Sequence, residues 1–551
     1  MDFDRALAKC GNNHRYQYLL LSLYSLLIGI SPYHHFSQNI INFVPEHYCY
    51  HEQLVNQSFA QLKALYSQFE KPSCTRLDSI DAAGNVTLSA ERCDRWFYNY
   101  DNGFRSMSAE LNWVCESNYK TPMGHSFNFL GSVFGTLIFG WLGDRIGRIW
   151  PLIGANLCAF VGDLAAVFTT NITSFSITRF IAGLAMDGDT CLMYILEYVS
   201  LDLRITSLNL IRNTSYAFGM IITSLTAISV GNWKLYLICA SMPKLLIISY
   251  NWLIQESAQW LITRNDIEGA IKRLRKIAKF NKRAVKEEHF EDFRSYCQTR
   301  AAKHAEEHQN KFTDIFKTPH LRNTVLRLLL IFTIMLFCRH ILSRSVQVVG
   351  ISPYISFALS ASVLPVAGLV QMKLQKNFGR KTTSTSAMLL TGLMVAASGI
   401  TLSLSKEPSV YLLVALMMLS RFGISVCFGA TLLYTSELVP TCVRSRILGA
   451  GYISGSIVSI LVPYILHLRT YNPAAPSIIL CLFFFSSAYT CLHLPETHNR
   501  KLPNTLAEGE QFGKHERMFD FLRRAKPVDE DEEIPSAETR EHLMPEQIVN
   551  S

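Results

Sequence analysis

The chain has 551 residues, of which 49% are apolar or aromatic, and it carries a net charge of +9. Its charged residues lie mostly in gaps between long apolar runs, which is typical of a polytopic helical membrane protein and excludes a string of soluble domains. The positive charge then reflects membrane topology, so we expect a lipid bilayer and no nucleic acid as partner.

Twelve stretches of about 20 mostly apolar residues are each long enough to cross the hydrocarbon layer. They lie near residues 17–40, 124–143, 150–170, 175–199, 206–230, 235–255, 324–347, 352–372, 383–404, 410–436, 446–467 and 475–494. We predict an all-α protein with two six-helix bundles, at 17–255 and 324–494. An N-terminus (1–16), a linker (256–323) and a tail (495–551) complete the chain.

Lys and Arg are concentrated in one set of short loops, which includes those holding Arg15, Arg145, Arg380 and Arg444. The opposite set holds little beyond Lys234, Lys406 and Arg469. Because cytoplasmic loops carry the excess of basic residues, we expect both termini to be cytoplasmic and the protein to lie in the plasma membrane.

The first region too polar to span is the loop 45–122, which this orientation places outside the cell. It holds four cysteines, Cys49, Cys74, Cys93 and Cys115, and glycosylation sequons at Asn56 and Asn85. Four cysteines in an oxidising compartment can form two disulfides in three possible pairings, and the sequence does not choose between them.

The second polar region is the linker, where apolar residues recur at helical spacing with Lys and Arg around them. The apolar positions are Ile267, Ala270, Ile271, Leu274, Ile277 and Ala278. Such a basic amphipathic helix can lie on the anionic inner leaflet, brace the two bundles, or be a solvated linker. The tail turns acidic at 529–533, and we expect it to be disordered.

Several polar residues and short polar segments recur at a fixed offset of 240 residues. Glu197 and Arg204 correspond to Glu437 and Arg444, and the segment ending at Ser257 corresponds to the one ending at Thr497. Each of these residues and segments lies at the end of an apolar stretch. The repeat indicates two similar halves, which is how many transporters create a central site that can open to either side.

The sequence resembles the organic cation and anion transporters of the solute carriers, within the major facilitator superfamily. The resemblance rests on the long cysteine-bearing loop closed by Glu-Leu-Asn-Trp-Val-Cys (110–115) and on Gly-Asp-Arg-Ile-Gly-Arg (143–148). Further similar segments are Glu-Ser-Ala-Gln-Trp-Leu (256–261) and Ser-Glu-Leu-Val-Pro-Thr (436–441). The resemblance implies alternating access by two bundles that rock about a midplane cavity.

The resemblance also implies a gating role for charged residues where the halves meet inside. These residues are Asp144, Arg145, Arg148, Glu197, Arg204, Arg380, Glu437 and Arg444. Charge pairs that form in only one state shift the equilibrium between states. The alternative is that they only fix topology and helix ends. Lys376 stands where the family usually has an acidic residue, so the two gates are not electrostatically equivalent.

Ionisable groups inside spans are costly, at about 2.5–3.5 kcal/mol each on insertion scales, so each needs a partner, a wet cavity or a function. We single out Asp187 and Asp189 in span 4, Lys244 in span 6, and Arg339 with His340 in span 7. Asp187 and Asp189 lie about 200° apart around a helix, so only one can face a given cavity. The alternative for each acid and for Lys244 is an internal salt bridge.

The resemblance places Arg339 and His340 beside the substrate cavity, where an Arg can hold a carboxylate bidentately. Their alternative is a partner role for Asp187 or Asp189. Arg421 matches a family arginine near the site, and Ser456 stands where related cation transporters carry Asp and anion or carnitine transporters carry Arg. Arg179 is expected only to anchor its helix, and His34 and His35 to make helix contacts.

These features predict a carrier that moves small organic ions, namely organic cations or zwitterions such as amino-acid-like compounds. The alternatives are an organic anion carrier and a non-transporting sensor or scaffold with the same fold. No nucleotide loop, metal-ligand spacing or nucleophile motif is evident in the polar segments, so we expect no enzyme activity, cofactor or metal.

Overall fold

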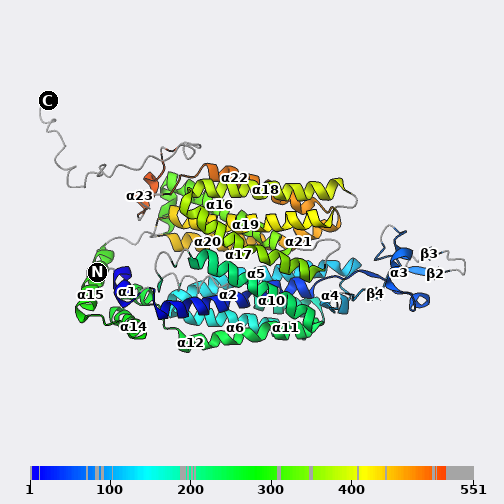
Figure 1. The fold of residues 1–551 in the computed structure, drawn as a ribbon, viewed down its shortest axis with the longest axis horizontal. Coiled ribbons are helices and arrows are strands. Elements are labelled where there is room, and N and C mark those ends of the chain that lie inside the picture. The colour runs from blue at the N-terminus through cyan, green and yellow to red at the C-terminus, as the bar shows by residue number, and fades with distance from the viewer. Residues whose placement is uncertain are drawn as a thin grey trace, which may run out of the picture.

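The computed structural model describes residues 3–516 apart from single residues and short runs, the longest being 81–85, 186–193, 307–311 and 346–351. Two bundles of helices lie side by side, with the blue and cyan N-terminal half below the yellow and orange C-terminal half in Figure 1. The N-terminus and the linker helices are at one end of the bundles, here called the linker end. The segment 45–119 projects from the other, the loop end (Figure 1).

The N-terminal half is built from helices that follow the predicted spans. They are α2 (Arg15–Ile41), α5 (Lys120–Ile146), α6 (Ile149–Ala166), α7 (Ile172–Gly183), η3 (Ser207–Ile211) with α10 (Arg212–Val230), and α11 (Trp233–Ser241) with η4 (Met242–Ser249) and α12 (Tyr250–Leu253). The predicted span 175–199 is described only in its first part, because 186–193 and 195–197 lie outside the described residues.

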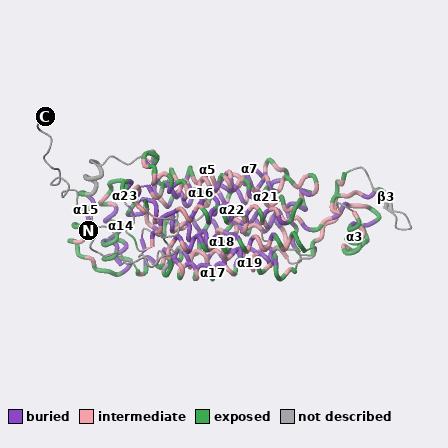
Figure 2. Tube along the Cα trace, turned by 90° about the horizontal axis from the view of Figure 1, so that it is seen from above, coloured by how far each residue is buried: buried purple, intermediate pink, exposed green. Residues whose placement is uncertain are grey.

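The C-terminal half repeats the pattern. Its helices are α16 (Pro319–Arg344), α17 (Pro353–Asn377), α18 (Arg380–Leu404), α19 (Val410–Leu438), α20 (Arg444–Ser459) with α21 (Val462–His467) and η6 (Leu468–Thr470), and α22 (Ala475–Leu492). Eight helices among the described residues are long and apolar enough to cross a membrane. Buried residues run along the middle of the bundles (Figure 2).

The loop-end segment is a small structure of its own. Strand β1 (His47–Cys49) pairs antiparallel with β4 (Trp96–Tyr98), and β2 (Leu77–Ile80) pairs with β3 (Val86–Leu88). These pairs are two separate sheets, and helix α3 (Phe59–Tyr66) packs against β1. The segment also contains η1 (Glu52–Leu54), α4 (Met107–Glu110) and η2 (Cys115–Tyr119).

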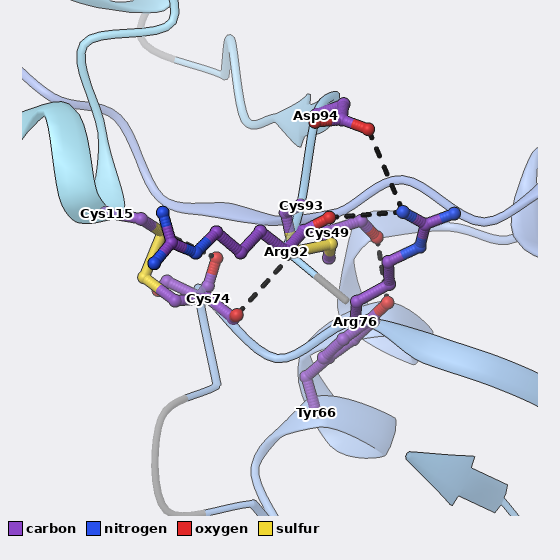
Figure 3. The surroundings of a disulfide bond; sticks show 9 residues. Cys49, Tyr66, Cys74, Arg76, Arg92, Cys93, Asp94 and Cys115 are labelled. Carbon is purple, nitrogen blue, oxygen red and sulfur yellow. Dashed lines mark hydrogen bonds and ion pairs between the residues drawn. A yellow bond between two sulfur atoms is a disulfide. The ribbon is translucent and has the colours of Figure 1, made fainter. Parts of the chain in front are cut away.

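Two disulfides cross-link the loop-end segment, and they show which of the three possible pairings is formed. Cys49 bonds to Cys93 and Cys74 to Cys115, with Cα atoms 5.8 and 5.7 Å apart. Around them, Arg76 Nη1 lies 3.8 Å from Asp94 Oδ2 (Figure 3). Each bridge closes a loop of some forty residues, which restricts the unfolded segment.

The linker forms a helical layer at the linker end. It consists of α13 (Ala258–Thr263), α14 (Ile267–Phe280), α15 (Glu287–Glu306) and η5 (Phe312–Lys317). The predicted apolar face of α14 is buried against α15 and the N-terminal helix α1 (Phe3–Cys10). Because this face is covered by the chain itself, the linker braces the N-terminal half, and the apolar face has no free surface to insert into lipid.

Asn281 joins this layer to the first span. Its Nδ2 donates to the carbonyls of Cys10 and Gly11 at 3.1 and 2.9 Å, and its Oδ1 accepts from the Tyr16 backbone N–H at 2.9 Å. The side chain is buried. One amide therefore satisfies three backbone groups where α1 turns into α2.

The chain after the last span closes over the C-terminal half. In α23 (Leu506–Gln511), the Glu510 carboxylate accepts the backbone N–H groups of His320 and Leu321 at 3.0 and 2.7 Å. Burial alone would raise the pKa of Glu510, but these N–H groups and His320 outweigh it and lower the pKa. Glu510 thus caps α16. The acidic part of the tail lies outside the described residues.

We predict that Asn281→Ala loosens the linker layer, because three buried backbone groups lose their partner, at a cost of roughly 2–3 kcal/mol. Limited trypsin digestion of the purified protein should cut faster after Lys279, Lys282 or Arg283. The exposed Ser295 on α15 offers a control, since Ser295→Ala should digest like the unsubstituted protein. Equal digestion of Asn281→Ala would contradict this role.

Candidate functional site

The repeated marks form the same carboxylate clamp in both halves. The Arg148 and Ile149 backbone N–H groups donate to the Glu256 carboxylate at 2.8 and 3.4 Å. In the second half, the Arg380 and Lys381 N–H groups donate to Glu496 at 2.7 and 3.1 Å. Each clamp holds the start of a span by placing a negative charge at a helix N-terminus.

Glycine leaves room for the carboxylate beside each clamp. A Cβ atom on Gly147 would collide with Glu256, and one on Gly379 with Glu496. The two halves also share a tyrosine hydrogen bond. Tyr194 donates to the Gln255 carbonyl, and Tyr434, 240 residues later, donates to the Pro495 carbonyl. The offset seen in the sequence thus corresponds to equivalent contacts at the linker end of each half.

The described gate candidates pair within their own halves. Arg148 Nη1 lies 3.2 Å from Asp144 Oδ1, whose side chain is 77% exposed, and the Arg145 guanidinium lies 4.5 Å from the Trp141 ring centroid. Arg380 Nε lies 3.1 Å from Glu437 Oε2. The two gates differ in burial, because the Arg380–Glu437 pair is mostly enclosed.

Three further gate residues complete this set. Arg444 Nε donates to the Val439 carbonyl at 3.4 Å, and Glu437 Oε2 also accepts from Thr497 Oγ1 at 2.7 Å. Glu197 and Arg204 lie outside the described residues. The gating role of the whole set therefore stays a prediction.

A pair of amides, which the sequence reading missed, joins the two halves near the linker end. Asn209 Nδ2 donates to Gln375 Oε1 at 3.0 Å, and both side chains are buried. A Cβ atom on Gly368 would collide with the Asn209 carbonyl, so η3 and α17 approach each other closely here. Amides at predicted helix ends carry no distinctive sequence pattern.

A buried ionic cluster lies inside the N-terminal half. Asp163 on α6 has its carboxylate 3.0 Å from Arg179 Nη1 on α7, 2.9 Å from His34 Nδ1 on α2 and 3.7 Å from Lys244 Nζ on η4. All four side chains are at most 7% exposed. Four helices of one bundle therefore meet at a single carboxylate.

Asp163 is a functional candidate that the sequence reading missed, although an acidic residue inside the apolar stretch 150–170 was a visible signal. Its position supports the alternative of an internal salt bridge for Lys244. It also agrees with the expectation that Arg179 anchors its helix and that His34 makes a helix contact. The charge of Asp163 is taken up by basic neighbours within its own half.

A second group of charges, the central basic cluster, lies where α16 faces α19 and the N-terminal half. It consists of Arg339, His340, Arg344 and Arg421. The Arg339 guanidinium lies 4.5 Å from the Phe428 ring centroid. Arg421 is 4% exposed, and its Nε has no hydrogen-bond partner. Arg339 and Arg344 lie close enough to Arg421 for their positive charges to repel it.

The rest of the central basic cluster faces the N-terminal half. Arg344 Nη1 lies 3.1 Å from His340 Nδ1, and its guanidinium lies 4.8 Å from the Phe129 ring centroid. The His340 ring centroid is 5.1 Å from that of Phe129 and 6.5 Å from that of His35. Arg344, four residues after His340 on the same helix face, is another residue that the sequence reading missed.

The four described side chains that define the central basic cluster are all basic. Within the described part of the chain, no ion pair involves Arg339 or Arg421. Ser456 is buried on α20 and adds no charge. Asp187 and Asp189 lie outside the described residues, so their predicted roles stay predictions. The same described residues contain no group of His, Cys, Asp and Glu able to hold a metal ion.

We predict that Asp163→Asn destabilises the protein by about 3–5 kcal/mol, because Arg179 and Lys244 would keep their buried charges without the carboxylate between them. The melting temperature of the purified protein in detergent measures this. Asp144→Asn is the control, since its exposed pair with Arg148 should contribute at most about 0.5 kcal/mol. Similar melting temperatures for the two variants would contradict this account of the cluster.

Known proteins that resemble this chain show the family to which it belongs. The family profile described as "Sugar (and other) transporter" matches residues 58–505. Among relatives, "Organic cation transporter-like protein" of Drosophila melanogaster is 25% identical over 96% of both chains, and human "Organic cation/carnitine transporter 2" is 26% identical over 92% of this chain and 93% of its own. "Solute carrier family 22 member 6" of Pseudopleuronectes americanus is 24% identical over 93% of this chain and 95% of its own.

A solved structure shares the fold. The partially occluded inward-open xylose transporter XylE from E. coli superposes with a TM-score of 0.57 at 16% identity, covering 88% of this chain and all of that one. The resemblance noted in the sequence is thus confirmed as distant similarity over nearly the full length, and the predicted fold is confirmed. The chain is a multi-pass membrane transporter, not an enzyme, and it belongs to the sugar (and other) transporter family of the major facilitator superfamily.

Proposed function

We propose that this transporter carries small organic ions that bear a carboxylate, by alternating access of its two halves. The observation that carries the proposal is the buried Arg421, whose Nε has no hydrogen-bond partner and whose charged neighbours are Arg339 and Arg344. Like charges gathered in a low-dielectric interior repel one another. A carboxylate entering between them relieves this repulsion and supplies the missing acceptor.

Aromatic rings complete the proposed binding site. The Arg339 guanidinium lies against the Phe428 ring and the Arg344 guanidinium against the Phe129 ring, at cation–π distance. Rings from both halves can then pack against the apolar part of a substrate. Both bundles contribute to this site, as alternating access requires.

The described charges favour the anionic alternative over a simple cation. Asp163, the one acid described within these buried clusters, is already taken up by Arg179, His34 and Lys244. The neutral Ser456 supplies no acid on α20. A zwitterion remains compatible through its carboxylate, and the names of the relatives include both cation and carnitine carriers.

The proposal includes an orientation, with the loop end outside the plasma membrane and the termini in the cytoplasm. Two disulfides in the loop-end segment suit an oxidising compartment. Asn56 is exposed there, as an N-glycosylation acceptor must be, whereas Asn85 lies outside the described residues. We further propose that the Asp144–Arg148 and Arg380–Glu437 pairs act as gates that exchange partners between states.

We expect uptake to follow charge in a panel of three labelled compounds that share a phenyl ring: benzoate, phenylalanine and benzylamine. Cells expressing the protein should take up benzoate fastest and benzylamine least. Arg421→Gln should lower kcat/KM for benzoate about 10- to 100-fold, the loss expected when hydrogen bonds from one charged group are removed.

Arg446→Gln is the matched control, because Arg446 is an exposed arginine at the linker end of the same half. It should take up benzoate normally. Preferred uptake of benzylamine would contradict a carboxylate substrate. A silent panel with normal surface expression would favour the non-transporting sensor or scaffold.

A further inference from the structure

A cavity of about 450 Å³ lies at the loop end, between the two halves. Its walls come from the end of α2 and the start of α5 in one half, and from α16, α17, α21 and η6 in the other. Arg344 of the central basic cluster is one of its lining residues, whereas Arg339 and Arg421 are not. The cavity therefore adjoins the proposed central site, shares Arg344 with it, and extends from there to the loop end.

Polar groups in the cavity wall lack partners. The Asn42 amide is 6% exposed, and neither its Nδ2 nor its Oδ1 has a hydrogen-bond partner. The Tyr354 hydroxyl, on a side chain only 2% exposed, has none either, and the same holds for the Thr121 hydroxyl. Buried polar groups are rarely left unsatisfied, so a wall with three of them indicates a place for a ligand with hydrogen-bonding groups.

The charged side chains among the described wall residues are Arg344 and Arg469. His125, Arg344, His467 and Arg469 line the cavity, and none of the described lining residues is acidic. Burial lowers the pKa of Arg469, as expected for a cation partly withdrawn from water. Phe43, Tyr354 and Phe357 supply aromatic surface. A basic, aromatic wall with free hydroxyl and amide groups matches a small aromatic carboxylate.

We propose that this cavity is a second, outer binding site for small carboxylates, in which Asn42 and Tyr354 bind the ligand before it reaches the central basic cluster. Tyr354 and Asn42 donate hydrogen bonds to the carboxylate, and the guanidinium groups of Arg344 and Arg469 attract it. The Asn42 carbonyl oxygen accepts from any hydroxyl or amine on the ligand. The ligand of this site has the same negative charge as the substrate in the proposed function, on which this inference rests for the choice of ligand. Its binding here does not require that transport occurs.

Protection of a cysteine in the wall tests this site. Ser345 lines the cavity and is close in size to cysteine, so Ser345→Cys places a thiol there. The purified variant is treated with a charged methanethiosulfonate reagent, and labelling of Cys at that position is followed by peptide mass spectrometry with benzoate or benzylamine present. Benzoate should slow labelling at least fivefold, and benzylamine should leave the rate unchanged.

Two added substitutions separate the outer site from the central one. In the Ser345→Cys background, Tyr354→Phe keeps the ring but removes the hydroxyl, and should raise the half-protecting benzoate concentration about tenfold. Arg339→Gln alters only the central cluster and should leave protection unchanged. Asn42→Asp, nearly isosteric but negative, should abolish protection.

Loss of protection in Arg339→Gln with full protection in Tyr354→Phe would overturn the proposal, because a single central site would then explain the effect. Absence of any protection by benzoate would overturn it as well. If protection follows Tyr354 while cells take up none of the three compounds, the outer site stands and the proposed transport function fails. Normal melting temperatures of the variants exclude misfolding as the cause.

Discussion

The constraint that organises this molecule is the cost of charge inside a membrane, where no water is present to solvate it. In the N-terminal half the cost is met internally, because Asp163 gathers Arg179, His34 and Lys244 around one carboxylate. In the central basic cluster, no described acidic side chain offsets this cost for Arg421, which is buried beside two other arginines. In the proposed function, the carboxylate of the substrate supplies the opposite charge. The sign of the proposed substrate follows from this contrast between a balanced and an unbalanced cluster.

The two similar halves that flank the central basic cluster are each held together by equivalent contacts. Glu256 and Glu496 hold the starts of α6 and α18 by the same hydrogen bonds, and Tyr194 and Tyr434 fix the adjacent turns. Each half is thus locked internally at the linker end, and the described Asn209–Gln375 amide pair that joins the halves there carries no charge. Strong contacts within each half and weaker ones between them suit two bodies that rock against each other. The outer cavity lies at the opposite end of the same seam.

Sequence reasoning recovered what depends on local pattern. Apolar length gave the bounds of the fully described spans to within a few residues, helical periodicity gave α14, and the 240-residue offset anticipated the paired clamps. What it missed depends on how helices rotate and pack. The pairing of Cys49 with Cys93 needs the strand register, the partner of Lys244 needs the facing of α6 and η4, and the role of Arg344 needs its approach to Phe129. The sequence left three roles open for the α14 linker helix, and only the structure shows that α1 and α15 cover its apolar face, a contact between segments far apart in the chain.

The central claim is that the midplane charge is positive and is neutralised by a bound carboxylate. The most direct measurement is the melting temperature of the purified protein in detergent at pH 7 as benzoate or benzylamine is titrated in, because a ligand that binds the folded state stabilises it by mass action. The account predicts a melting temperature that rises with benzoate concentration and does not move with benzylamine. A rise with benzylamine and none with benzoate would contradict it.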